Sequence, residues 1–363
     1  MYDILISGYY GFENSGDDAI LMAILDNLKS CKPDVKILVL SKKPEETKRI
    51  YGVDAADRFN FSEVIKAMKS SKLFLNGGGN LIQDESSTRS LMYYLTTIYL
   101  AKKLGLKVML YSNGIGAVTK KMNRMITSMI INKADVITLR EETSLKEIEN
   151  LRVHNPKIIV TADPAFTLQP CTESETDSIL AAEGIKKDKP LVGISLRKWK
   201  NAQSYAKQVA SAADYMIEKY DVQPVLIPMH YPHDMEICHA VASLMKHQPD
   251  IIKNKYSVPQ TLGIIKSMDM VIGMRLHALI YGVSLEVPVI GLIYDPKVEG
   301  FLQYAQQPSA GHVENLNYDK FVETIDEVWN KREQIKEQLK ASKQSFVDKA
   351  LQNAEIAIEL LNK

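Results

Sequence analysis

The chain of 363 residues lacks several features that mark particular classes of protein. Its three cysteines are widely spaced and form no CxxC pair, so neither a disulfide framework nor a cysteine-based metal site is expected. No apolar run approaches the roughly 20 residues of a membrane-spanning helix, and the N-terminus lacks the basic start and long apolar core of a signal peptide. The formal net charge is only +1, so no overall field attracts nucleic acid or an anionic membrane. We expect a cytoplasmic protein without a nucleic-acid partner, and a peripheral contact with the inner face of the membrane stays open.

Short β-branched apolar runs alternate with longer segments of helical period. The predicted strands form two sets, at 4–6, 37–40, 73–75, 108–111, 136–139 and 158–160, and at 191–196, 225–228, 251–252, 270–272 and 287–292. This alternation predicts the α/β class, with parallel sheets covered by helices on both faces.

A polar stretch bounded by prolines separates the two sets of strands. We therefore expect an N-terminal Rossmann-like domain over 1–170, a linker with a short helix over 171–189, and a C-terminal Rossmann-like domain over 190–330. The two domains are expected to face each other across a cleft. A charged helix over 331–363 should pack back on the N-terminal domain.

One helical segment carries a methionine-rich stripe. Met122, Met125, Ile126, Met129 and Ile130 recur at the spacing of a single helix face. We expect this stripe to lie in the core, because methionine is a flexible filler of apolar interiors.

Polar residues and glycines follow the predicted strands of the first set, where an open parallel sheet binds its ligands. The loop after the first strand contains Asn14 and Asp17, but it matches neither GxGxxG nor the Walker motif. We interpret it as a loop that faces a sugar or phosphate, in which Asp17 accepts a hydroxyl proton. The alternative is that Asp17 or Asp18 only caps the following helix.

Two further sites follow strands of this set. A glycine-rich segment after 73–75 would let a ligand approach the backbone, with asparagines to bind hydroxyls, unless it is merely a flexible turn; its candidate residues are Asn76, Gly78, Gly79 and Asn80. Arg140 ends the strand 136–139 and is followed by two glutamates. It could bind an anion or form a salt bridge.

Basic residues follow several predicted strands of the second set. Arg275 and His277 lie where the strand 270–272 gives way to a helix N-terminus, a place that favours anions. Lys297 follows the last strand of this set, and Arg197 follows the first. A small phosphate- or carboxylate-bearing substrate would suit these groups. The alternative is that Arg275 pairs with a carboxylate and His277 caps the helix.

The segment PMHYPHD contains two histidines and a carboxylate, but this spacing is weak evidence for a metal site. We expect His230 to take part in hydroxyl recognition or loop structure. No metal and no other cofactor is expected.

Taken together, these motifs resemble the polysaccharide pyruvyl transferase family, most closely the bacterial enzymes that act on cell-wall polymers. The resembling segments span residues 4–297 and read GYYGFENSGDDAIL, FLNGGGNLIQD, ADVITLREETS, VTADPAF, VGISLRKW, PMHYPHD, DMVIGMRLHALIYG and YDPK. The resemblance implies a GT-B-like arrangement of two Rossmann-like domains. It also implies phosphoenolpyruvate as the donor and a pyruvate ketal on a sugar as the product. The implied acceptor is a lipid-linked disaccharide or polysaccharide precursor that contains N-acetylmannosamine and serves to anchor a surface layer.

On this resemblance, Arg275, His277 and Lys297 match the donor-binding positions, and Asp17 matches the acidic residue of the N-terminal loop. We expect His277 to transfer a proton or stabilise phosphate, and Asp17 to act on the acceptor hydroxyl. Two other functions stay open. One is a glycosyltransferase of the same architecture that uses a nucleotide sugar, and the other is a non-catalytic module that binds phosphosugars.

Overall fold

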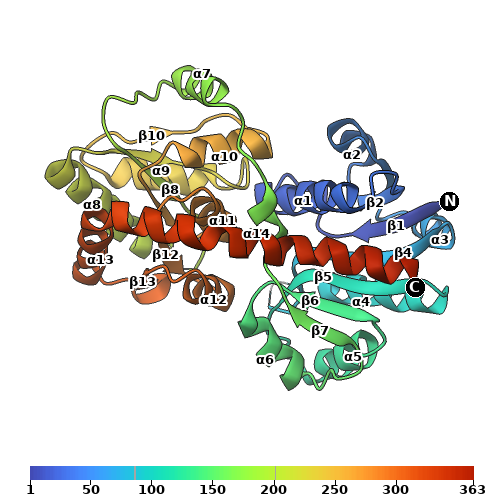
Figure 1. Ribbon diagram of the computed structural model, residues 1–363. Helices are drawn as coiled ribbons and strands as arrows, with labels where there is room; N and C mark the ends of the chain where they lie inside the picture. The colour runs from blue at the N-terminus through green and yellow to red at the C-terminus, as the bar shows by residue number, and fades with distance from the viewer. Residues whose placement is uncertain (86, 201) are drawn as a thin grey trace. The chain divides into compact units, whose positions relative to one another are not determined.

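The computed structural model describes residues 1–85, 87–200 and 202–363. The chain forms two compact units, each with its own parallel sheet (Figure 1). The first unit comprises residues 1–13, 17–168 and 346–363. The second unit comprises residues 14–16 and 169–345.

The sheet of the first unit has the strand order β3-β2-β1-β4-β5-β6-β7, and neighbouring strands are parallel. Its interior strand β1 alternates between two cores: Ile4 and Ile6 pack on one face and Leu5 on the other. The strands are β1 (Tyr2–Ser7), β2 (Ile37–Ser41), β3 (Asp54–Asp57), β4 (Ser71–Ile82), β5 (Lys107–Ile115), β6 (Val136–Leu139) and β7 (Lys157–Val160).

Helices cover both faces of this sheet. One core lies beneath α1 (Ser15–Cys31), with the segment after α2 (Pro44–Tyr51) packed at its margin. The other core lies beneath α3 (Phe61–Lys69), α4 (Thr88–Lys103), α5 (Lys121–Ile131) and α6 (Glu142–Asn150). A short 3-10 helix, η1 (Pro164–Thr167), ends the first long stretch of this unit.

The last helix, α14 (Arg332–Asn362), returns to the first unit from residue 346 onward. Ala354 and Ala357 join the core beneath α1. The buried Asn353 side chain accepts a hydrogen bond from Thr161 Oγ1 at 2.9 Å and donates to the Ala162 carbonyl at 3.1 Å. These contacts confirm that the C-terminal helix packs on the N-terminal domain.

The second unit has the strand order β10-β9-β8-β11-β12-β13, and its neighbouring strands are also parallel. Its strands are β8 (Leu191–Ser195), β9 (Gln223–Leu226), β10 (Asp250–Ile251), β11 (Met270–Gly273), β12 (Val289–Ile293) and β13 (Ser309–His312). Its helices are α7 (Glu173–Glu183), α8 (Ala202–Tyr220), α9 (Met235–Leu244), α10 (Val258–Lys266), α11 (Leu276–Ser284), α12 (Pro296–Tyr304), η2 (Val313–Asn315) and α13 (Tyr318–Asn330).

All predicted strands are present, and the predicted α/β class with two parallel sheets is confirmed. The strands β3 and β13 were not predicted. Both are edge strands with few large apolar residues, DAAD and SAGH, because an edge strand is buried less completely than a central one. The predicted linker over 171–189 belongs to the second unit, where Glu183 accepts hydrogen bonds from the backbone N–H groups of Lys253 and Asn254.

The expectation for the stripe of α5 is wrong for its three methionines and is confirmed for Ile130, which is buried in the core, and for Ile126, which packs against it. Met122, Met125 and Met129 are 62%, 61% and 59% exposed, whereas Asn123 and Thr127 are buried. The inward face of the helix combines Ile130 and Ile131 with Asn123, whose Nδ2 donates to Asp84 at 2.7 Å. Across the described residues, no helix is long and apolar enough to cross a membrane.

Candidate active site

The second unit has a topological switch point between β8 and β11. From β8 the chain moves to β9 and β10 on one side, and then crosses to β11 and β12 on the other. Open parallel sheets bind ligands outside the carboxyl ends of the strands at such a point. Arg197 follows β8 and Arg275 follows β11, so both predicted arginines lie at this switch point.

Arg275 is held by a carboxylate that sequence reasoning did not select. Its Nε donates to Asp234 Oδ2 at 2.9 Å, and its Nη2 pairs with the other carboxylate oxygen. Asp234, whose side chain is 1% exposed, also accepts the backbone N–H of His230 at 2.9 Å. The bidentate pair fixes the guanidinium plane and leaves Nη1 outside the pair. The alternative for Arg275 was a salt bridge to a carboxylate, and Asp234 provides that carboxylate. The pair orients Arg275 at the switch point.

Arg197 and Lys297 meet at the Tyr294 side chain. Arg197 Nη1 donates to the Tyr294 hydroxyl at 3.1 Å, and the guanidinium lies 4.7 Å from the ring centroid. Lys297 Nζ lies 5.3 Å from the same centroid and 3.0 Å from Asp295 Oδ2. Asp295 caps α12 by accepting the Lys297 backbone N–H, which places the lysine on the first turn of that helix.

The two cations change the acidity of Tyr294. Burial by itself raises the pKa of this hydroxyl, but Lys297 and Arg197 outweigh burial, and the pKa lies below the ordinary value. Burial raises the pKa of Tyr205, and the charges of Arg197, Asp234 and Arg275 act on the same hydroxyl to a smaller extent. Because β8, β11 and β12 are neighbouring parallel strands, Arg197, Arg275 and Lys297 form a cluster of cations at one edge of the sheet, with Asp234 and Asp295 as their carboxylate partners.

His277 lies on the first turn of α11, two residues after Arg275, which occupies the N-cap position. Its ring packs against Gly16, one of the three N-terminal residues that belong to the second unit. A Cβ atom on Gly16 would lie 2.1 Å from His277 Nδ1. This close approach explains why position 16 holds a glycine. It also shows that the Nδ1 edge of the imidazole ring faces the backbone of Gly16.

The segment 14–16 is anchored to the second unit by backbone contacts. Asn14 forms an antiparallel bridge with His230, and the Ser15 N–H donates to the Met229 carbonyl at 3.0 Å. The Tyr281 hydroxyl donates to the Ser15 carbonyl at 3.1 Å. The Asn14 side chain accepts the Gly16 N–H at 3.0 Å, as a helix cap does, so Asn14 and not an aspartate makes this capping bond.

In the first unit the switch point lies between β1 and β4, and Asp17 lies there on the first turn of α1. A Cβ atom on Gly79 would lie 3.4 Å from Asp17 Oδ1, so the carboxylate lies beside the backbone of β4. Burial and the Asp17 charge both raise the pKa of the Tyr10 hydroxyl. Asp17 is thus located at the carboxyl edge of the sheet, as predicted.

The glycine-rich segment is not a turn, because β4 runs through it to Ile82. Gly78 has a φ of 61°, and a Cβ atom there would lie 2.2 Å from Ile20 Cγ2, so this glycine is required by packing against α1. Asn76 is buried and donates to Asn113 Oδ1 at 2.8 Å. Asn80 approaches Gly116 on the neighbouring segment. Packing accounts for Gly78 and an amide pair accounts for Asn76, whereas Gly79 contacts the candidate acid.

Arg140 lies in a buried ionic cluster. Its Nε donates to Glu141 at 2.8 Å and its Nη1 to Asp163 at 3.2 Å, and all three side chains are less than 10% exposed. The structure therefore places this arginine in the salt bridge weighed as its alternative role. Two buried carboxylates share this one guanidinium, so removal of Arg140 would leave both of them without their cation.

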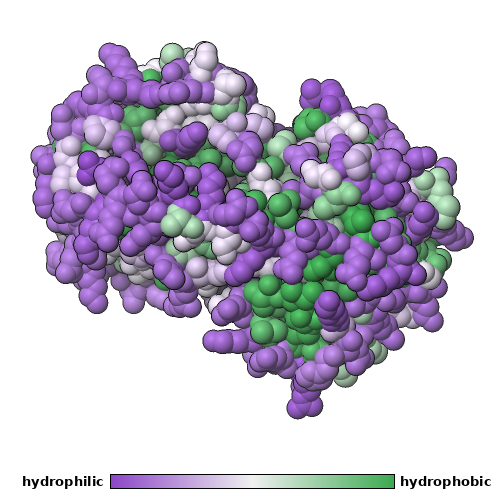
Figure 2. Space-filling view, viewed as in Figure 1, coloured by the Kyte–Doolittle hydropathy of each residue, from purple (hydrophilic) through white to green (hydrophobic). Residues whose placement is uncertain are grey.

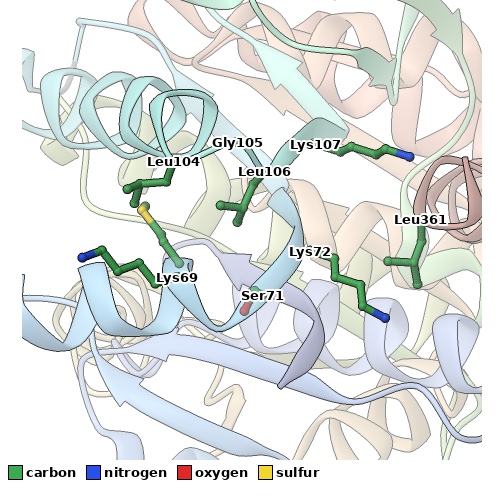
Figure 3. A pocket seen from close by; sticks show the side chains of 9 residues that line it. Lys69, Ser71, Lys72, Leu104, Gly105, Leu106, Lys107 and Leu361 are labelled. Atoms are coloured by element: carbon green, nitrogen blue, oxygen red, sulfur yellow. The ribbon is translucent and has the colours of Figure 1, made fainter.

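Other parts of the described structure offer weaker sites. Within them, no group of three or more His, Cys, Asp or Glu residues could hold a metal ion. A pocket of the first unit lies at the amino-terminal edge of its sheet, where Figure 3 shows the Lys69 ammonium pointing away from those of Lys72 and Lys107. Lys72 is paired with Asp3, and Lys107 donates to the Leu360 carbonyl. These lysines do not converge on one anion.

Solved structures define the fold class of the protein. MnaA from S. aureus, solved with UDP, aligns with a TM-score of 0.71 and 13% identity over 100% of this chain and 98% of that one. A glycosyltransferase from Rickettsia africae aligns with a TM-score of 0.67 and 14% identity over 100% of this chain and 99% of that one. HepE from Anabaena, solved with UDP-glucose, aligns with a TM-score of 0.68 and 10% identity over 99% of both chains. The fold is the two-domain α/β fold of GT-B glycosyltransferases and related epimerases.

The sequence profile of the polysaccharide pyruvyl transferases matches residues 14–296. The chain therefore belongs to the polysaccharide pyruvyl transferase family, and is a transferase of polysaccharide biosynthesis. A curated relative is the amylovoran biosynthesis protein AmsJ of Erwinia amylovora. It is 23% identical over 406 aligned positions, which cover 93% of this chain and 94% of the relative.

Sequence reasoning missed Asp234, Tyr294 and Tyr205 as parts of the cluster. Asp234 was considered only as part of a weak metal motif, although it pairs with an arginine 41 residues away. Tyr294 could have been selected, because it follows β12, as Lys297 does.

Proposed function

We propose that the protein transfers the pyruvyl group of phosphoenolpyruvate, as a ketal, onto a sugar of a polysaccharide precursor and releases inorganic phosphate. The observation that carries this proposal is the cluster of Arg197, Arg275 and Lys297 at the carboxyl ends of β8, β11 and β12. Phosphoenolpyruvate carries a phosphate and a carboxylate close together, so several converging cations suit it.

The reaction places defined demands on the site. A proton must be added to the methylene carbon of the donor, which makes the adjacent carbon electrophilic. One sugar hydroxyl adds to that carbon and a second closes the ring as the bond to phosphate breaks. Of the two hydroxyl protons, one balances the proton added to carbon and the other leaves with phosphate. The site needs an acid, a base and cations for the departing phosphate.

We assign these tasks by position. Arg275, oriented by Asp234, and Lys297 hold the donor, and Arg197 completes the positive cluster. His277 lies on the first turn of α11, so it transfers the proton or stabilises the leaving phosphate. Asp17 at the carboxyl edge of the first unit acts on the acceptor hydroxyl. No metal is required by this scheme, because protein cations supply the charge.

The acceptor is proposed from the family resemblance alone. We expect a lipid-linked disaccharide or polysaccharide precursor with an N-acetylmannosamine residue, which serves to anchor a surface layer. The protein would meet this acceptor in the cytoplasm at the inner face of the membrane.

The test is incubation of the protein with phosphoenolpyruvate labelled in its pyruvyl carbons, together with a lipid-linked acceptor. We expect label in the acceptor and release of one inorganic phosphate per label. Label that stays in the soluble three-carbon fraction would contradict the proposal. A site that only binds phosphosugars predicts no phosphate release.

A second candidate function follows from the solved structures with UDP and UDP-glucose, which share the fold. On this alternative the cations of the second unit bind a diphosphate, and the protein transfers a sugar. A parallel incubation with labelled UDP-sugars distinguishes the two, since each predicts transfer from one donor only.

A further inference from the structure

Exposed apolar side chains are distributed unevenly between the two units. Among the described residues, ten large apolar side chains are exposed, and nine of them belong to the first unit. Seven of the nine lie on or directly beside α3, α4 and α5, namely Phe59, Phe61, Tyr99, Leu104, Met122, Met125 and Met129. These helices cover the same core, so their outer surfaces belong to one side of the unit.

The centre of this surface is α5. Met122, Met125 and Met129 are spaced so that they share one helix face, and each is about 60% exposed. The inward face packs Ile130 and Ile131 into the core and also holds the buried Asn123, which donates to Asp84. Helix α5 is therefore apolar on two faces, since its isoleucines face the core and its methionines face solvent.

The same side of the unit carries a net positive charge. Helices α3, α4, α5 and α6, which cover it, contain eight basic and four acidic residues, which gives a formal charge of +4 in a chain whose net charge is +1. Exposed lysines flank the methionines at both ends of α5, at Lys120, Lys121 and Lys133. Helix α4, which packs against α5, adds the exposed Lys103 next to Tyr99.

We propose that the outer face of α5 and its neighbours, which we call the α5 face, docks the protein on an anionic phospholipid bilayer. Methionines flanked by cations suit such a surface, because the thioether chains enter the acyl boundary while ammonium groups meet headgroup phosphates. Long lysine stems allow the charges to stay at headgroup level. Figure 2 shows a further hydrophobic area on the same unit, near β6 and β7, whereas purple dominates the visible surface of the second unit.

Charge favours a bilayer over a second copy of this chain as the occupant. Two copies meeting through this face would bring together two surfaces of the same net positive charge, which opposes association. An anionic bilayer offers the complementary sign. The inference does not rest on the proposed function, because docking is measured without turnover.

The test is sedimentation of the full chain with vesicles of phosphatidylcholine, with and without phosphatidylglycerol. We expect binding to the anionic vesicles, loss of binding in high salt, and little binding to phosphatidylcholine alone. A wild-type protein that stays in the supernatant with anionic vesicles would overturn the proposal.

Two sets of variants assign the binding to the α5 face. Met122→Gln, Met125→Gln and Met129→Gln together keep helix propensity and should lower vesicle binding by about tenfold or more. The matched control, Ile50→Gln with Leu244→Gln, removes exposed apolar side chains elsewhere and should bind as the wild type does. Equal losses in the two variants would overturn the assignment.

The charge contribution is tested in the same way. Lys120→Gln, Lys121→Gln and Lys133→Gln together should lower binding to anionic vesicles by about fivefold per charge. A control set of exposed lysines in the second unit, changed by Lys253→Gln, Lys255→Gln and Lys320→Gln, should have no such effect. Size-exclusion chromatography of the methionine variant completes the test. An altered oligomeric state there would show that the α5 face is a protein interface and contradict the proposal.

Discussion

Replacement of Gly16 by alanine tests the packing of the segment 14–16 against His277. Intrinsic helix propensity favours alanine over glycine by about 1 kcal/mol, so propensity alone predicts a more stable protein. The structure predicts the opposite. An added Cβ atom would lie 2.1 Å from His277 Nδ1 and 2.6 Å from its Cγ, and the imidazole would have to move. Overpacking of this kind costs about 1–3 kcal/mol, so the net effect should be destabilising.

The displacement also has a catalytic consequence. If His277 moves by about 1 Å, the rate should fall by roughly 100-fold, because proton transfer depends on its position. Thermal unfolding and phosphate release measure the two effects on the same preparation. The double variant Gly16→Ala/His277→Ala is the control, because without the ring the added methyl group should cost little. The reasoning is refuted if Gly16→Ala is neutral or stabilising with normal turnover, or if it costs the same with and without the ring.

The other predictions concern the cation cluster, the first unit and acid stability. Arg275→Ala should abolish turnover and the protection that phosphoenolpyruvate gives against thermal unfolding; unchanged turnover would remove this residue from the site. Tyr294→Phe removes the acceptor of the Arg197 hydrogen bond and should raise the KM for phosphoenolpyruvate about tenfold, whereas an unchanged KM would separate this tyrosine from the donor. Asp17→Asn should leave the Kd for phosphoenolpyruvate unchanged in calorimetry and should slow transfer. A collapse of donor affinity would show that Asp17 binds the donor and does not act on the acceptor. Burial raises the pKa of Glu183, but hydrogen bonds from backbone N–H groups and side chains outweigh burial and hold that pKa below its ordinary value. This carboxylate therefore stabilises the fold above the ordinary pKa, and the contribution is lost as the pH falls through the folded pKa. Urea unfolding should show that in Glu183→Gln the free energy of unfolding depends less on pH below about pH 5 than in the wild type. Glu173→Gln, at an exposed position, is the control and should behave as the wild type does.

Central strands could be predicted because they are buried on both faces and their sequences are continuously apolar. This holds for β1, β8 and β11, and it also located the loops that follow them. The edge strand β3 could not be found, because its sequence DAAD has neither an apolar run nor clear alternation. A helical period revealed the stripe of Met122, Met125 and Met129, but a period does not say which face the fold will cover.

The candidate site was predictable where a residue type and a strand end coincide. Arg275, His277 and Lys297 satisfy this condition, and the structure locates each one there. The partner of Arg275 was not predictable, because Asp234 is distant in sequence and the pairing depends on β9 and β11 lying on either side of β8. Gly78 shows the reverse case, in which a residue type that suits ligand approach is used for packing.

The most direct test of the central claim is a crystal structure of the protein with phosphoenolpyruvate bound. The account predicts the phosphate and carboxylate of the donor in contact with Arg197, Arg275 and Lys297, with His277 beside the reacting carbons or the phosphate. Donor density at any other place, or a nucleotide sugar bound by these residues while phosphoenolpyruvate is not, would contradict it.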